Sequence, residues 1–377
     1  MMTRGARLTT ISIMLIILIA GCTPQDGSRS GQPLPGGPDL VPSTTRTASL
    51  STGTPYPTKT ASFTPTPTPV VFEIGQDLTI DYLRELEISG SPLTIEEKLS
   101  PGYNYQRYLA SYQSEGNTIY GLLTVPFGEP PEGGFKAIVF NHGYIPPEVY
   151  NTLERYAGYI DYLARSGFVV FKIDYRGHGR SEGYASGSYF SPGYTIDAIS
   201  ALKSLQTLEY VDPKGIGVWG HSMAGNLVLR AMLIEPDVKA GVIWAGAVYS
   251  YEDFTTYGIS DSSYRPPSTV EGQNENDVPR RSRMLIDSYG PPDLSQPYWQ
   301  AISLTANLDY LTAPLQIHHA EDDPVVNIAY SYGLAEQLQL QQKTYEFYIY
   351  EGGGHNIISP YFDQAMQRTV QFFQDNL

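Results

Sequence analysis

The stretch at residues 215–225, GIGVWGHSMAG, constrains the fold of this chain more than any other part of the sequence. Residues 216–219 form an apolar run typical of a buried strand, and residues 226–234 have the pattern of a helix. Ser222 stands between them among small residues, in an approximate G-x-S-x-G pattern with Ala224 in place of the last glycine. A serine at such a corner keeps its hydroxyl outside the packed sheet, at a helix N-terminus. Ser222 is therefore a candidate nucleophile, and the alternative is an ordinary strand–helix junction with a capping serine.

Apolar runs and helical stretches alternate on both sides of this corner. Residues 105–113 and 117–125 alternate apolar and polar side chains, as in a hairpin. Further strands are predicted at residues 135–140, 168–173, 241–248, 315–318 and 345–350, and helices at residues 78–88, 150–166, 195–208 and from 361 to the C-terminus. Strand–helix alternation with nearly continuous apolar strands predicts an α/β fold, in which helices cover both faces of a mostly parallel central sheet.

Residues 249–311 do not fit this alternation. The segment is rich in aromatic side chains, namely Tyr251, Phe254, Tyr257, Tyr264, Tyr298 and Trp299. A long connection inside a compact domain is usually functional, for example as a lid or a pocket wall. We therefore predict a cap-like insertion here, and a solvated surface loop is the alternative.

The overall charge and the single cysteine limit the classes of function. A formal net charge of −15 disfavours binding to the phosphate backbone of nucleic acids. One cysteine cannot form an intrachain disulfide. The sequence contains no P-loop, dinucleotide-binding fingerprint or paired C-x-x-C motif, so no cofactor is expected.

The N-terminus resembles a bacterial lipoprotein signal peptide. Arg4 and Arg7 precede an apolar run at residues 11–20, which is short for a membrane span. The run ends in Ile-Ala-Gly before Cys22, as in a lipobox, so we expect residues 1–21 to be removed and Cys22 to be lipidated. Several acyl chains on one residue would anchor the protein firmly to the outer side of the cell membrane. An ordinary export signal with an incidental cysteine is the alternative.

A Pro-, Thr- and Ser-rich segment at residues 22–69 has too few large apolar side chains to fold, and we predict a disordered linker there. The composition becomes globular from residue 70, so residues 70–377 are predicted to form the catalytic domain. The sequence does not indicate an oligomeric state.

From residue 105 to the C-terminus, the chain resembles the α/β-hydrolase family. The motifs that carry the resemblance are His142-Gly143, the Asp174-to-Ser181 turn, Gly220-His-Ser222-Met-Ala224, the turn at residues 320–326 and Gly354-His355. Within that family, the chain looks most like the catalytic domains of prolyl-oligopeptidase-type peptidases and related esterases. The region before the hydrolase core is far too short for the β-propeller of full-length oligopeptidases.

A nucleophilic serine needs a base, and the base needs an orienting acid. His355 follows a strand and a glycine run and comes last in the Ser-Asp-His order, which makes it the candidate base. Asp323 follows the strand after the insertion, at the carboxyl edge of the sheet, and is the candidate acid. Its neighbour Asp322 and the more distant Asp253 are the alternatives.

An oxyanion hole is also required by this chemistry. The backbone N–H of Met223 lies at the start of the helix after the serine and is one candidate donor. The resemblance to prolyl-oligopeptidase-like enzymes suggests Tyr144 as the second, through its backbone or its hydroxyl. Arg176, in the turn after the strand at residues 168–173, is expected to tie loops together.

A metal site built from His318, His319, Asp322 and Asp323 is disfavoured, because adjacent strand residues point to opposite faces of a sheet. We therefore expect a serine hydrolase without a metal. It would cleave an ester or a peptide bond, with a peptidase favoured over a carboxylesterase. The alternative from another class is a cell-surface binding protein on the same fold.

Overall fold

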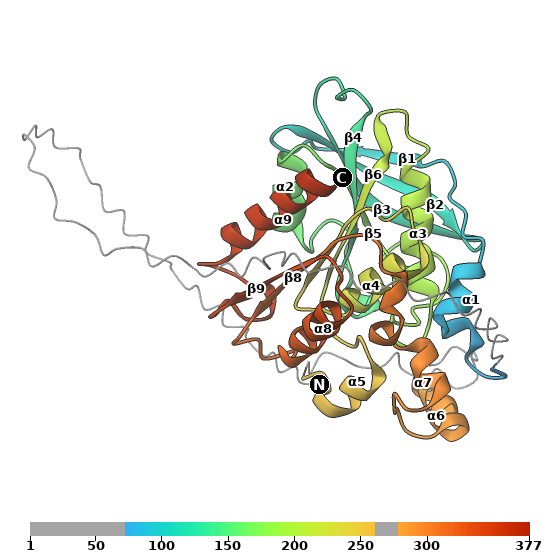
Figure 1. Ribbon diagram of the computed structural model, residues 1–377. Coiled ribbons are helices and arrows are strands. Elements are labelled where there is room, and N and C mark those ends of the chain that lie inside the picture. Colours follow the sequence, from blue (N-terminus) through green and yellow to red (C-terminus); the bar gives the residue numbers. More distant parts are fainter. Residues whose placement is uncertain (1–71, 261–277) are drawn as a thin grey trace, which may run out of the picture. The chain divides into compact units, whose positions relative to one another are not determined.

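The computed structural model describes residues 72–260 and 278–377 (Figure 1). The predicted signal peptide, Cys22, the linker at residues 22–69 and Tyr264 lie outside these residues. None of the described helices combines the length and the apolar composition needed to cross a bilayer.

A nine-stranded sheet forms the centre of the described chain, in the order β1-β2-β3-β5-β4-β6-β7-β8-β9. One edge is antiparallel and consists of β1 (Thr94–Leu99), β2 (Tyr105–Ser114) and β3 (Asn117–Pro126). The other strands run parallel: β4 (Phe135–Asn141), β5 (Val169–Ile173), β6 (Val211–His221), β7 (Gly241–Trp244), β8 (Leu315–Ala320) and β9 (Tyr345–Tyr350). The predicted hairpin and the mostly parallel sheet are both confirmed.

Helices cover both faces of this sheet, as predicted (Figure 1). The helices α2 (Ala157–Arg165) and α9 (Phe362–Asn376) pack on one face around Trp219 and Trp244. On the other face lie α3 (Gly193–Leu205), α4 (Ala224–Ile234) and α8 (Ala329–Leu340). The short elements η1 (Gln76–Leu78) and α1 (Ile80–Glu85) precede the sheet, and α1 contacts α4. Burying both faces explains why the strands read as nearly continuous apolar runs.

Some predicted boundaries are wrong for local reasons. The helix expected at residues 150–166 begins only at Ala157, because Tyr156 has a φ of 61° and the preceding segment forms the short η2 (Pro147–Val149). The strand expected at residues 241–248 ends at Trp244, since Ala245 and Val248 have φ values of 47° and 61°. Left-handed backbone cannot continue a helix or a strand. Strand β1 and helix α8 were not predicted.

The described parts of the segment at residues 249–311 are folded into short helices joined by loops. It contains α5 (Tyr251–Tyr257), α6 (Val278–Tyr289), α7 (Pro297–Ile302) and η3 (Leu304–Tyr310). Tyr298 and Trp299 are buried, and the Tyr298 ring lies 5.1 Å from that of Phe72. The Tyr289 hydroxyl donates to Ile74 O at 2.8 Å. These aromatic side chains therefore hold the residues around η1 against the insertion.

Candidate active site

Ser222 occupies the sharp corner between β6 and α4. Its φ of 58° is strained for a residue with a side chain. The corner is held by two backbone hydrogen bonds: Ser222 N donates to Trp244 O at 2.9 Å, and Gly225 N donates to Ser222 O at 2.9 Å. Met223 precedes the first residue of α4, so its N–H points outward from a helix N-terminus.

The structure explains why Ala224 can stand where the G-x-S-x-G pattern has its last glycine. A Cβ at Gly220 would lie 2.7 Å from Ala224 O, and one at Gly225 would lie 2.6 Å from Gly246 Cα. The closest approach of backbones after the serine is therefore at Gly225, and the methyl group of Ala224 is fully buried without needing a glycine.

Asp323 is the carboxylate that contacts His355. The Asp323 Oδ2 atom lies 2.8 Å from His355 Nδ1, and its Oδ1 atom accepts hydrogen bonds from Val325 N and Val326 N at 2.8 and 3.0 Å. Of the two alternatives, Asp322 instead accepts from Gly354 N at 2.8 Å and so holds the histidine loop. Asp253 is in the first turn of α5, where its N–H bonds to the Ser250 hydroxyl.

A second histidine reaches the same carboxylate oxygen. His319, at the end of β8, places Nε2 3.1 Å from Asp323 Oδ2 and Nδ1 2.7 Å from the Ser331 hydroxyl. Burial alone would raise the pKa of Asp323, but the hydrogen bonds from His319 and His355 hold it well below the usual range. From the sequence, His319 was considered as a metal ligand, and its contact with Asp323 was not predicted. Its position four residues before an aspartate in a tight turn was the available signal.

His355 is fixed beside the serine corner through its backbone. It lies in η4 (Gly354–Asn356), which follows β9, and its side chain is 15% exposed. His221, the residue before Ser222, places Nε2 2.8 Å from His355 O, and the two imidazole rings are 4.5 Å apart between centroids. The structure thus brings His355 to Asp323 and to the residue preceding Ser222.

His221 also connects this loop to the loop after β4. The Tyr156 hydroxyl lies 2.8 Å from His221 Nδ1 and accepts a hydrogen bond from Gly143 N at 2.9 Å. The His355 carbonyl can only accept, so His221 donates to it from Nε2, and its Nδ1 then accepts from the Tyr156 hydroxyl. This direction requires a neutral imidazole, and burial lowers the pKa of His221 to about 3. We call Gly143, Tyr156, His221 and the His355 carbonyl the loop-linking chain.

The loop after β4 lies directly against Ser222. A Cβ on Gly143 would be 3.1 Å from Ser222 Cβ, so this backbone borders the candidate nucleophile. Tyr144 follows it and is half-buried against the core. His142 is fully buried and stacks on Tyr150, as expected for a structural residue of the turn.

His318 and Arg176 make contacts that stabilise the fold and do not reach Ser222. His318 bonds the Tyr350 hydroxyl at 2.8 Å, whereas His319 faces Ser331 and Asp323, so the two imidazoles have different environments. Within residues 72–260 and 278–377, no group of three or more His, Cys, Asp or Glu side chains is placed to hold a metal ion. Arg176 bridges Asp197 and Glu115 at 2.7 and 2.9 Å and so ties loops together, as predicted.

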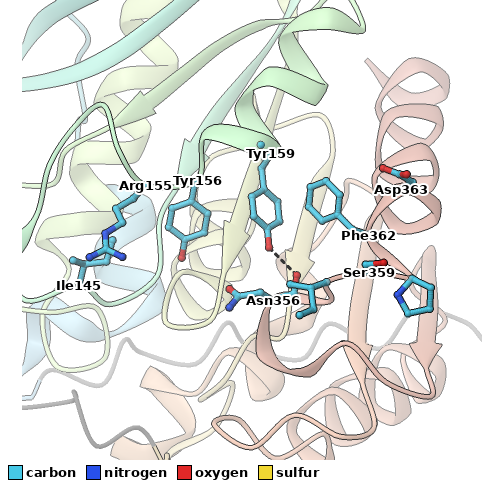
Figure 2. A pocket seen from close by; sticks show the side chains of 11 residues that line it. Ile145, Arg155, Tyr156, Tyr159, Asn356, Ser359, Phe362 and Asp363 are labelled. Carbon is cyan, nitrogen blue, oxygen red and sulfur yellow. Dashed lines mark hydrogen bonds between the residues drawn. The ribbon is translucent and has the colours of Figure 1, made fainter. Parts of the chain in front are cut away.

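A pocket of about 640 Å³ lies beside these loops (Figure 2). Its walls come from Ile145 in the loop after β4, from the start of α2 and from the segment that follows His355. Tyr159 closes one wall by donating from its hydroxyl to Asn356 O at 2.7 Å. A pocket of this size is typical of a site for a small organic ligand.

Comparisons with known proteins agree with this geometry. The sequence profile of the Prolyl oligopeptidase family matches residues 155–377. Uncharacterized peptidase YtmA of Bacillus subtilis is 26% identical over 280 residues, covering 72% of this chain and 92% of the relative. Protein ABHD12B of Homo sapiens is 26% identical over 200 residues, covering 52% of this chain and 50% of the relative.

Two solved structures illustrate the shared fold. Acetyl xylan esterase 1 from Thermoanaerobacterium superposes with a TM-score of 0.57 at 16% identity, covering 80% of this chain and 94% of the esterase. Dipeptidyl peptidase 4 of Porphyromonas gingivalis superposes with a TM-score of 0.53 at 20% identity, covering 73% of this chain and 36% of the peptidase. The family match spans more than half of the chain. This protein is therefore a serine hydrolase of the prolyl oligopeptidase family, with an α/β-hydrolase fold.

Proposed function

We propose that this protein is a serine peptidase that cleaves short peptides through an acyl-enzyme, with Ser222 as nucleophile, His355 as base and Asp323 as acid. One observation carries the assignment: His355 is hydrogen-bonded to Asp323 at 2.8 Å while His221, next to Ser222, holds the His355 carbonyl at 2.8 Å. A base oriented by an acid beside a strained serine is the arrangement that nucleophilic catalysis requires.

The reaction follows from these positions. Ser222 Oγ attacks the substrate carbonyl and passes its proton to His355 Nε2, while Asp323 stabilises the imidazolium that forms. The backbone N–H of Met223, at the N-terminus of α4, and a donor from Tyr144 would stabilise the oxyanion. His355 then protonates the leaving amine, and a water molecule activated by the same imidazole hydrolyses the acyl-enzyme.

A peptide substrate is supported by the family profile and by the relative named as a peptidase, which this chain matches over 92% of that protein's length. Ester hydrolysis is the second candidate, because the same triad serves both reactions. It is favoured by the acetyl xylan esterase, 94% of which superposes on this chain.

Labelling with a fluorophosphonate tests the nucleophile. The wild-type protein should label, and Ser222→Ala should abolish labelling and lower kcat by about 10⁶-fold. Ser288→Ala, at an exposed serine in α6, is the matched control and should label normally. An unlabelled wild-type protein would refute the triad and favour a binding protein on this fold.

A substrate panel separates the two candidate reactions. Short peptides and aminoacyl anilides should be turned over with higher kcat/KM than acyl esters of the same acyl group, once each rate is divided by its uncatalysed rate. Turnover of esters alone would replace the peptidase assignment with an esterase.

We also propose that the protein is exported and lipid-anchored through Cys22, which lies outside the described residues. The support is the order of basic residues, apolar run and small residues before the cysteine. In cells, the wild-type protein should incorporate labelled fatty acid and Cys22→Ala should not; a wild-type protein without label, or a labelled C22A variant, would contradict lipidation at this cysteine.

A further inference from the structure

The pocket lies beside the loop that carries His355, since Asn356, Ile358 and Pro360 line it. His355 has to protonate the leaving group, so that group lies next to the imidazole during the reaction. Asn356, the residue after His355, lines the pocket, and so do Tyr156 and Ile145. Gly143 lies between the pocket and the serine. Its N–H donates to the hydroxyl of Tyr156, a pocket residue, at 2.9 Å, and its ideal Cβ position is 3.1 Å from Ser222 Cβ. The pocket therefore lies beside the residue that follows His355, and Tyr156 in its wall bonds the Gly143 backbone that borders Ser222.

The lining of this pocket selects for an apolar, flat ligand. Tyr156, Tyr159 and Phe362 form one wall, with ring centroids 5.6 Å apart for the first pair and 5.0 Å for the second. Ile358 also lines the pocket and is 59% exposed, so apolar surface remains available to a ligand. Aromatic walls of this kind bind rings by offset or edge-to-face packing.

Charged side chains occur only at the ends of the row of rings that Figure 2 displays. Arg155 lies at one end and Asp363 at the other, with the aromatic side chains between them. The two opposite charges balance one another, so the pocket has no net charge preference from them. This arrangement favours an uncharged side group over an acidic or basic one.

We propose that this pocket is the leaving-group subsite and that it takes an uncharged aromatic group, such as the side chain of an aromatic residue directly after the cleaved bond. The proposal rests on the proposed serine hydrolase mechanism, since it assigns the leaving-group side from the role of His355. It adds the class of substrate, which neither the family nor the triad specifies.

Gly158 offers a way to fill the pocket without disturbing the triad. It lies in α2 and lines the pocket, and a Cβ there would meet Phe362 Cζ at 3.9 Å, an ordinary contact. Gly158→Leu should therefore fold and occupy the space. Gly333→Leu is the matched control, because Gly333 lies in α8, which does not line the pocket, and its Cβ would meet nothing within 4 Å.

The experiment compares pairs of substrates that share an acyl part and differ in the leaving group. One pair is a peptide cleaved before phenylalanine and the same peptide cleaved before alanine; a second pair is a benzyl and an ethyl ester. The wild-type protein and Gly333→Leu should prefer the aromatic leaving group by about tenfold or more in kcat/KM, and Gly158→Leu should lose most of that preference. Fluorophosphonate labelling of Gly158→Leu should stay within about twofold of wild type.

A second readout uses added nucleophiles. Phenylalaninamide should capture the acyl-enzyme better than glycinamide in the wild type, and this difference should disappear in Gly158→Leu. The proposal is overturned if the wild type shows no aromatic preference or if Gly158→Leu retains it, while normal labelling leaves the triad intact. If the wild-type protein itself were not labelled, the proposed function would be refuted instead.

Discussion

Two buried aspartates stand at the carboxyl ends of parallel strands in this sheet, and their surroundings are opposite. Asp174 follows β5 directly and Asp323 follows β8, and neither carboxylate has exposed surface. Hydroxyl groups of Tyr150 and Thr152 donate to Asp174. Two imidazoles and two backbone N–H groups contact Asp323.

The pKa values of the two groups move in opposite directions for this reason. Burial raises the pKa of Asp174 to about 6, because Lys172 and the two hydroxyls offset only part of the desolvation. Burial acts on Asp323 in the same sense, but its histidine partners outweigh it and the pKa falls. Burial alone therefore does not mark a catalytic acid: its hydrogen-bond donors decide whether the carboxylate stays charged and can stabilise an imidazolium.

The largest effect expected from this difference is on turnover. Asp323→Asn should lower kcat by about 10⁴-fold, because the amide can neither fix the tautomer of His355 nor stabilise its charge. Asp174→Asn is the matched variant and should change kcat by less than about tenfold. Both should be measured on folded protein verified by circular dichroism. Equal losses in the two variants would mean that Asp323 has no special role.

The next effect concerns stability and pH. Since folding raises the pKa of Asp174 from 3.8 to about 6, the stability it contributes is fully present below pH 3.8 and is lost as the pH rises through 6. The loss is on the order of 3 kcal/mol. Asp174→Asn should remove this loss, so the free energy of unfolding should fall less between pH 4 and pH 7 in the variant than in the wild type. Urea titrations across this range measure it, and an unchanged pH dependence in the variant would contradict the raised pKa.

The third prediction concerns His319, which contacts Asp323 and has no counterpart at Asp174. His319→Leu removes one donor to Asp323 Oδ2, and we expect kcat/KM to fall by roughly 10- to 100-fold, the range of one charge-assisted hydrogen bond. The pKa of Asp323 is depressed, so its stability contribution is lost as the pH falls below its unfolded value. Acid unfolding should therefore begin at a higher pH in His319→Leu. His319→Gln retains a donor and should restore part of both properties, which a purely steric role would not predict.

The smallest effect should come from the two tyrosines that precede α2. Tyr156→Phe breaks the loop-linking chain between Gly143 N and His221, and kcat should fall about tenfold with little change in KM. Tyr150→Phe removes a donor to Asp174 and should leave kcat within about twofold. Steady-state kinetics on one substrate are sufficient for both. If Tyr150→Phe lost more activity than Tyr156→Phe, the loop-linking chain would not position the site.

Local sequence patterns predicted much of the sheet and the serine corner. The apolar run of β6, the small residues around Ser222 and the glycine run before His355 are local signals, because they reflect steric limits on neighbouring residues. Strand β1 was missed, since its side chains are largely exposed and carry no apolar run. The late start of α2 was missed because nothing in the residues around Tyr156 signals its left-handed backbone.

The sequence by itself determined an alternating α/β chain, the order of serine, aspartate and histidine, and a serine forced into a strained corner. Only the tertiary structure decided which aspartate meets His355, and that His221 and His319 also contact the site. The physical reason is register: β8 and β9 pair in parallel with Ala320 opposite Tyr350. That pairing brings together Asp323 and His355, which are 32 residues apart, while the Nε2 of His221 reaches a carbonyl 134 residues away. Contacts over such separations depend on how the strands align, and no local pattern of residues encodes that alignment.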